Sequence, residues 1–133
     1  MLVLKTMKTT KPVLATQELE IMKIVWQRGN ATVRDVYEEL LTRRKIAYTT
    51  IMTMMGILEQ KGYLTKKESG RAYVYRPTES ERKVLGVMVR DFVKRVFGGS
   101  SKPLFVHLLD SGDATAEELE ELSKLLKDKR RKK

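Results

Sequence analysis

The segment from Tyr48 to Tyr73 constrains the fold more than any other part of this 133-residue chain. Its apolar residues recur at the spacing of one buried helix face, and they are Ile51, Met54, Met55 and Leu58. Gly62 follows them, and glycine readily adopts the left-handed conformation with which many helices end. Two short apolar runs, 63–65 and 73–75, then flank a basic stretch. The segment therefore predicts a helix, a stop and a two-stranded hairpin.

The opposite face of this predicted helix is small or uncharged, which suits close approach to another molecule. It carries Thr49, Met52, Thr53, Gly56 and Gln60. Basic residues lie on both sides of the helix in the sequence, at positions 43–45 and in the predicted turn 66–71. A helix with such a face, followed by a basic hairpin, is typical of a winged helix-turn-helix DNA reader.

Two further predicted helices complete a three-helix head over residues 14–77. The first spans 17–28, with Thr16 as its N-cap and Trp26 in the core. The second runs from Val33 to about Thr42, after a capping box formed by Thr32 and Asp35. Its predicted buried face consists of Val36, Tyr37, Leu40 and Leu41. Residues 1–13 are predicted to form a flexible basic arm.

The distribution of charge separates the chain into a DNA-facing part and a protein-facing part. The net charge is +10, which favours a polyanionic partner. Residues 1–77 hold 14 basic and 7 acidic side chains, whereas residues 78–123 hold 6 basic and 9 acidic ones. There is no cysteine and no apolar run of membrane-spanning length, so we expect a cytoplasmic protein without membrane insertion.

After Pro77 the pattern predicts three helices, at about 79–97, 103–110 and 116–127, followed by a basic tail, 128–133. Capping boxes are expected before the first and the last of these helices, formed by Thr78 with Glu81 and by Thr115 with Glu118. Some fifty residues are few for an independent core, and a second copy of the chain is the simplest partner. We therefore expect residues 78–127 to form a helical dimerisation domain. The residues expected at the dimer interface are Leu85, Met88, Phe92, Val96, Leu104, Leu108, Leu119, Leu122 and Leu126.

The ordered series of motifs resembles the penicillinase-repressor (BlaI/MecI) family, to which the copper-responsive CopY repressors also belong. The resemblance covers roughly residues 14–127 and rests on segments 19–26, 31–36, 48–53, 61–62 and 70–75. It implies a mainly α-helical fold with a small β-wing, namely a winged-helix head and a C-terminal dimerisation module. It also implies a homodimeric transcriptional repressor that sits on a palindromic operator in double-stranded DNA.

We expect two sets of residues to contact DNA. Those expected near base edges are Tyr48, Thr49, Thr50, Met52 and Thr53, because hydroxyl and methyl groups can meet several bases. Those expected to bind phosphate are Arg43, Arg44, Lys45, Lys66, Lys67, Arg71 and Tyr73. For Arg71 the alternative is a stem packed on Tyr73 or an ion pair with Glu68.

Two departures from the family concern the inducing signal. Copper-responsive members carry a C-terminal cysteine cluster, which this chain lacks. Penicillin-responsive members are cut by a sensor metalloprotease at an Asn–Phe bond, and His107-Leu108 stands at that position here. Three alternatives follow: a cut elsewhere in the chain, a sensor protease of different specificity, or no cleavage.

The remaining motifs do not indicate catalysis or a cofactor. No nucleophile–base pair, metal-ligand spacing or phosphate-binding glycine loop is recognisable, so neither an enzyme nor a metal site is expected. His107, the only histidine, is expected to pack rather than to act as a ligand. Two alternatives stay open: a winged helix that binds RNA or a protein, and a transcription factor that responds to a small ligand.

Overall fold

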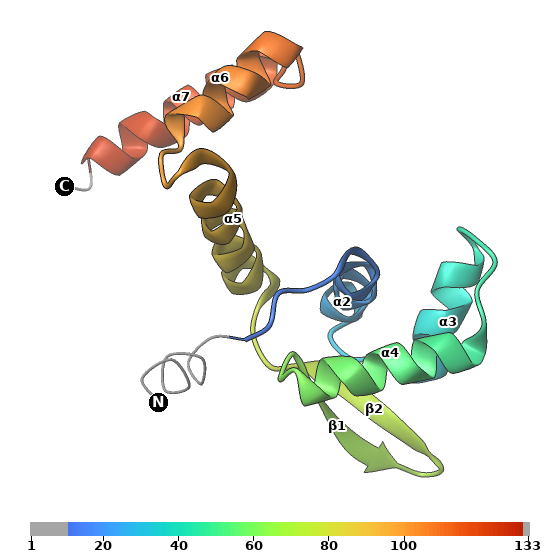
Figure 1. Ribbon diagram of the computed structural model, residues 1–133. Helices are drawn as coiled ribbons and strands as arrows, with labels where there is room; N and C mark the ends of the chain where they lie inside the picture. Colours follow the sequence, from blue (N-terminus) through green and yellow to red (C-terminus); the bar gives the residue numbers. More distant parts are fainter. Residues whose placement is uncertain (1–10, 132–133) are drawn as a thin grey trace. The chain divides into compact units, whose positions relative to one another are not determined.

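The computed structural model describes residues 11–131 of the protein (Figure 1). They form two compact units, of which the first ends at Gly86 and the second begins at Val87. The predicted boundary at Pro77 is thus earlier in the chain, and the division of function between the units stays a prediction. Each unit is described by itself below.

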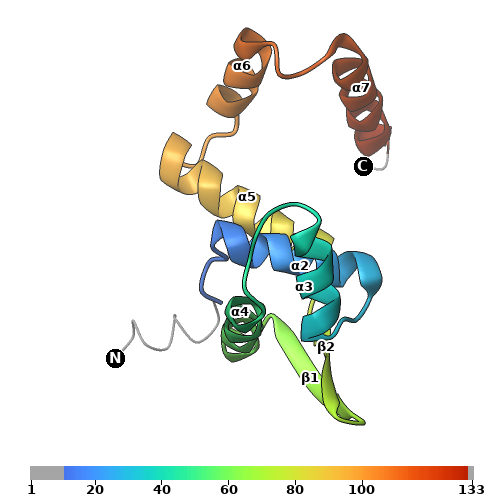
Figure 2. The same ribbon diagram turned by 90° about the vertical axis from the view of Figure 1, so that its right-hand side faces the viewer.

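Three helices form the core of the first unit, and they are α2 (Thr16–Arg28), α3 (Val33–Leu41) and α4 (Tyr48–Gln60). Figure 2 views α4 nearly end-on, with α2 and α3 on one side of it and the hairpin extending away from the helices. The side chains that fill the centre are fully or almost fully buried: Ile21, Met22, Val25, Val36, Leu40, Ile51, Met55 and Leu58. In α4 the apolar periodicity thus predicted the inner face, although Met54 is only partly buried.

The start of α2 differs from the prediction. Its N-cap is Ala15, not Thr16, and alanine has no side-chain oxygen to accept a hydrogen bond. Glu18 compensates, because its Oε1 accepts the Ala15 backbone N–H at 2.8 Å and also the Lys61 ammonium at 2.7 Å. The helix therefore starts one residue earlier than predicted. The ion pair between Glu18 and Lys61, which stabilises this start, joins residues far apart in the sequence and could not be predicted from the local pattern.

Helix α3 starts as predicted and ends within one residue of the predicted end, but its predicted buried face is only partly confirmed. Thr32 Oγ1 accepts the Asp35 N–H at 3.1 Å, while Asp35 Oδ2 accepts the Thr32 N–H at 2.9 Å. This capping box holds the pKa of Asp35 below its usual value, chiefly through the Thr32 N–H. The expected burial of Leu41 was wrong, because this last residue of the helix is 43% exposed.

The hairpin has longer strands and a tighter turn than predicted. Strands β1 (Leu64–Ser69) and β2 (Ala72–Pro77) are antiparallel, with Ser69 opposite Ala72. Only Gly70 and Arg71 connect them, and Gly70 has a φ of 64°. A two-residue loop with positive φ at its first position alone is the type II′ turn, which needs glycine there. Lys66 and Lys67 therefore lie on a strand rather than in a turn.

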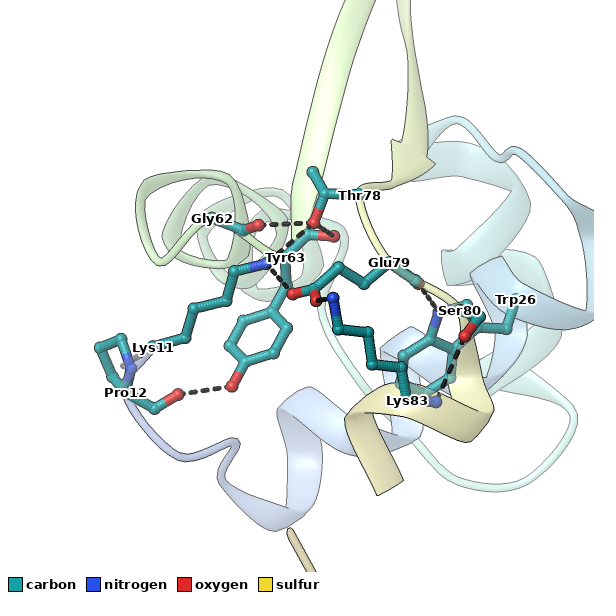
Figure 3. A network of polar contacts seen from close by, with 9 residues as sticks. All are labelled: Lys11, Pro12, Trp26, Gly62, Tyr63, Thr78, Glu79, Ser80 and Lys83. Carbon is teal, nitrogen blue, oxygen red and sulfur yellow. Dashed lines mark hydrogen bonds and ion pairs between the residues drawn. The ribbon is translucent and has the colours of Figure 1, made fainter. Parts of the chain in front are cut away.

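A polar network joins the start of the described chain to residues 78–80, which follow the hairpin (Figure 3). Lys11 contacts the carboxylate of Glu79 and donates to Thr78 Oγ1 at 3.1 Å. The Tyr63 hydroxyl donates to the Pro12 carbonyl at 2.7 Å. Residues 11 and 12 thus lie against the head, whereas residues 1–10 of the predicted arm fall outside the described residues.

The same network changes two further predictions. Trp26 is half-buried rather than fully in the core, because its indole N–H reaches the Glu79 carbonyl at 2.9 Å. Thr78 does not form the expected capping box with Glu81. Its hydroxyl donates instead to the Gly62 carbonyl at 2.6 Å. Ser80 Oγ accepts the Lys83 N–H at the start of the next helix, which begins at Glu81.

Helix α5 (Glu81–Phe97) runs from the first unit into the second, which also contains α6 (Lys102–Ser111) and α7 (Ala116–Arg131). The predicted capping box of Thr115 and Glu118 at the start of α7 is confirmed. Helix α7 continues through Arg131, so the first four residues of the predicted tail are helical and the last two lie outside the described residues. Among residues 87–131 only Val93 is buried.

Candidate nucleic-acid interface

The exposed face of α4 is free of charge over most of its length. No acidic or basic residue occurs from Tyr48 to Leu58, and Glu59 is the first ionisable group after that. Thr49, Thr50 and Thr53 are exposed, and Met52 is 49% exposed. The face thus presents hydroxyl, methyl and thioether groups, which can contact base edges. None of these groups is charged, so none needs an ion-pair partner.

The N-terminus of α4 is suited to an anion. Its N-cap, Ala47, has no side-chain acceptor, and the first turn contains no acid. The first N–H groups of the helix, together with its dipole, therefore favour negative charge. Tyr48 has a second role here, because its ring packs edge-on against Tyr37 at a centroid distance of 5.3 Å. This contact anchors α3 to the start of α4 and leaves Tyr48 39% exposed.

The arginines of the turn between α3 and α4 have partners within the head. Arg44 Nη1 lies 2.5 Å from Glu20 Oε1, and Arg43 Nη1 lies 3.7 Å from Glu20 Oε2. Arg43 also lies 3.6 Å from Glu39. The two arginines thus tie this turn to α2, and a phosphate would share them with Glu20. Lys45, the third base of the turn, is exposed.

The basic residues of the hairpin divide between its two faces. Lys66 is opposite the buried Tyr75, and its ammonium lies 3.4 Å from Glu59 Oε1. Lys67 is opposite Val74 on the other face and is exposed. Glu59 raises the pKa of Lys66 by hydrogen bonding to its ammonium. Only one of the two lysines is therefore turned toward the head.

Arg71 is exposed at the tip of the hairpin. Among the described residues it makes no ion pair with Glu68, and the cation over the Tyr73 ring is Lys66, at 4.5 Å from the centroid. These contacts therefore do not favour the alternative for Arg71, in which it packs on Tyr73 or pairs with Glu68. Tyr73 itself is 47% exposed.

The predicted phosphate set omitted Arg76. This arginine is exposed and lies opposite Thr65, on the same face of the hairpin as Lys67. Strand alternation would have identified it if the second strand had been predicted to reach Pro77 rather than to end at Tyr75.

Two other classes of site find no support in the part of the chain that the structure covers. Residues 11–131 contain no cluster of His, Asp and Glu side chains positioned to hold a metal ion. Over the same range, every helix is too short or too polar to cross a bilayer.

Comparisons with known proteins agree with this geometry. A family model described as penicillinase repressor matches residues 14–128. The penicillinase repressor of Bacillus licheniformis is 29% identical over 122 residues, which cover 92% of this chain and 95% of the relative. The transcriptional regulator BlaI of Mycobacterium tuberculosis is 34% identical over 112 residues, which cover 79% of this chain and 81% of the relative.

A solved structure resembles the head. The solution structure of the DNA-binding domain of the repressor BlaI superposes with a TM-score of 0.50 at 33% identity, and the match covers 54% of this chain and 88% of that chain. This likeness confirms the winged-helix fold predicted from the sequence. Since the family model also spans most of the sequence, the chain belongs to the penicillinase repressor family.

Proposed function

We propose that the protein acts as a homodimer that binds an inverted-repeat operator through α4 and the hairpin. As a penicillinase repressor, it is a DNA-binding transcriptional repressor. The observation that carries the proposal is the uncharged, exposed face of α4, which lies between basic residues of the preceding turn and of the hairpin.

Sequence reading is assigned to the first two turns of α4. Thr49, Thr50 and Thr53 offer hydroxyl groups to several bases, and the methyl groups of threonine and Met52 can pack on thymine. Tyr48, at the edge of this face, can reach the same groove with its exposed part. We therefore expect half-sites that contain A·T pairs.

Affinity without sequence information is assigned to the basic side chains around α4. Lys45, Lys67 and Arg71 are exposed, and no acid lies within ion-pair distance of them among residues 11–131. Arg43, Arg44 and Lys66 were predicted as phosphate ligands too, but each already has an acidic partner in the head. We expect the first group to contribute more.

Dimerisation is assigned to the second unit and the part of α5 that leads into it. In a single chain this unit leaves most of its apolar side chains in solvent: Phe105 is 54% exposed and Leu125 is 63% exposed. Neither α6 nor α7 has a single buried residue. Soluble monomers rarely expose so much apolar surface, and a second copy would cover it.

Selection of binding sites from random duplex DNA tests the proposal. The full-length protein should select an inverted repeat whose half-site centres are about 10 bp apart, or a multiple of that. Selection of single, unrepeated sites would contradict a symmetric dimer, and no selection at all would contradict specific binding.

Relief of repression by a sensor metalloprotease is the remaining part of the proposal. His107 and Leu108, at the position where the family resemblance implies a cut, lie inside α6 and are exposed. The centroids of the His107 and Phe97 rings are 5.8 Å apart. A protease needs an extended peptide, so a cut there requires the helix to unwind locally. Mass spectrometry of the protein after induction would locate the cut, and an intact chain would exclude this route.

A further inference from the structure

We propose that Glu59 and Lys66 form a strut that holds the hairpin at a fixed angle to α4. The inference rests on the proposed function, because its consequence concerns how the tip of the hairpin meets a duplex. In this proposal both are positioning residues, and Lys66 is not one of the phosphate ligands.

The strut joins the last turn of α4 to the middle of β1. Lys66 Nζ lies 3.4 Å from Glu59 Oε1 and 4.5 Å from the centroid of the Tyr73 ring. The side chains of Glu59 and Lys66 are each 34% exposed. The ammonium is thus held between a carboxylate of the helix and an aromatic face of the second strand, which together fix its position.

The register of the hairpin explains why Lys66, and not Lys67, takes this role. Side chains of directly opposed residues lie on the same face of a sheet, and Lys66 is opposite the buried Tyr75. Lys67 follows on the other face, opposite Val74. Adjacent lysines in the sequence therefore have different tasks: one connects the hairpin to the helix, and the other remains exposed.

Glu59 lies on the same exposed face of α4 as the residues assigned to base contacts. It follows Gly56 by three positions and Met52 by seven, the spacings that bring residues to one side of a helix. An isolated carboxylate there would repel the phosphates of DNA. The contact with Lys66 neutralises this charge, and it gives an acid on this face a physical reason to be present.

The distance from Lys66 to the tip of the hairpin makes the angle between the hairpin and α4 important. At about 3.3 Å per strand residue, the tip is about 15 Å beyond Lys66, and a rotation of about 10° would move it by about 2.5 Å. A displacement of that size breaks a hydrogen bond to a phosphate. The backbone hydrogen bonds between Ala31 and Tyr75 hold β2 to the head at the same level, and the strut fixes the remaining freedom of the hairpin. It thereby helps to set whether Arg71, at the tip, reaches its ligand.

The substitution Glu59→Gln separates the strut from simple electrostatics. Loss of an acid near DNA should tighten binding, whereas loss of the strut should weaken it, by about two- to fivefold for a partly exposed pair. Glu68→Gln is the matched control, since this exposed acid of β1 has no basic partner among the described residues and its removal should not weaken binding. The probe is the inverted-repeat duplex that the wild-type protein selects from random DNA.

The effect of Arg71→Ala on DNA binding should depend on whether the strut is intact. A contact that only stabilised the fold would not change this effect. In the wild-type background, Arg71→Ala should reduce the slope of log K against log salt by about 0.9 per monomer. In the Glu59→Gln or Lys66→Met background, it should have almost no further effect. Lys67→Met is the control, and its effect should add to that of Arg71→Ala.

Hydrogen exchange in the free protein tests the strut without DNA. Amides of residues 64–77 should exchange faster in Glu59→Gln and Lys66→Met, and at the wild-type rate in Lys67→Met. Unchanged exchange, or a Glu59→Gln protein that binds as tightly as the wild type, would overturn the proposal. A wild-type protein that selects no DNA would count against the proposed function instead, and the exchange rates would still decide on the strut.

Discussion

The ammonium of Lys61 donates a 2.7 Å hydrogen bond to Glu18, the one acid with a buried side chain among the described residues. Burial alone would raise the pKa of Glu18, but Lys61 and the Ala15 N–H outweigh it and lower that pKa. The carboxylate is therefore charged in the folded protein, and it depends on both partners. The pair connects the start of α2 to the end of α4.

Substitution of Lys61 by methionine should lower the free energy of unfolding by about 1–3 kcal/mol, because a buried carboxylate loses a charged donor. Urea denaturation at neutral pH measures the effect. Lys67→Met removes an exposed lysine of the same kind and should have little effect. Equal stability of the two variants would show that solvent replaces Lys61 at no cost.

Acid should destabilise the head through Glu79. Hydrogen bonds from Lys11 and Lys83 lower the pKa of Glu79 from 4.5 to about 2. Because the folded-state pKa is the lower one, this stabilisation is complete above about pH 4.5 and is lost as the pH falls toward 2. Glu79→Gln should therefore have a lower Tm than the wild type at pH 7, and the two should converge near pH 2.

Lys11→Met removes the first of these donors, so it should reproduce part of the pH dependence of Glu79→Gln. Its effect should be smaller in the Glu79→Gln background, since both variants remove the Lys11–Glu79 contact and only the hydrogen bond of Lys11 to Thr78 is left to lose. Thermal unfolding followed by circular dichroism provides the measurement. A wild-type Tm that falls no more steeply than that of Glu79→Gln would contradict this role of the carboxylate.

Local patterns predicted the helices well because each buries a periodic apolar face, as Ile51, Met55 and Leu58 do in α4. They failed where a distant partner decides. The N-cap of α2 is Ala15 rather than Thr16, because Lys61 holds the Glu18 carboxylate that accepts the Ala15 N–H. The Thr78 hydroxyl bonds to the Gly62 carbonyl and therefore does not cap α5. The same limit applies to the interface, since no local pattern shows that Glu20 engages Arg43 and Arg44.

Met52→Arg should change the sequence preference of the protein. Met52 is 49% exposed in the middle of the uncharged face of α4, and an arginine there can form a bidentate pair with guanine. Site selection should then yield a G·C pair at one position of each half-site, with the spacing of the half-sites unchanged. An unaltered selected sequence would show that position 52 does not face the bases.

A fragment that ends at Gly86 should be a monomer, whereas the full-length protein should be a dimer. The cut keeps the first compact unit, including the contacts of Trp26 and Lys11 with Glu79, and removes the exposed apolar side chains of α6 and α7. Sedimentation equilibrium at micromolar concentration distinguishes the two states. A full-length monomer under these conditions would refute the proposed dimer.

Arg71→Ala should weaken binding to all DNA sequences by similar factors and reduce the salt slope by about 0.9 per monomer. Arg71 is exposed at the tip of the hairpin, and within residues 11–131 it has no acidic partner, so the change removes no contact from the head. Thermal stability should therefore stay at the wild-type value. Titrations at several salt concentrations, with the selected duplex and with a random one, separate this role from base reading: an effect confined to the selected duplex would assign Arg71 to a base, and an unchanged slope would remove the tip from the interface.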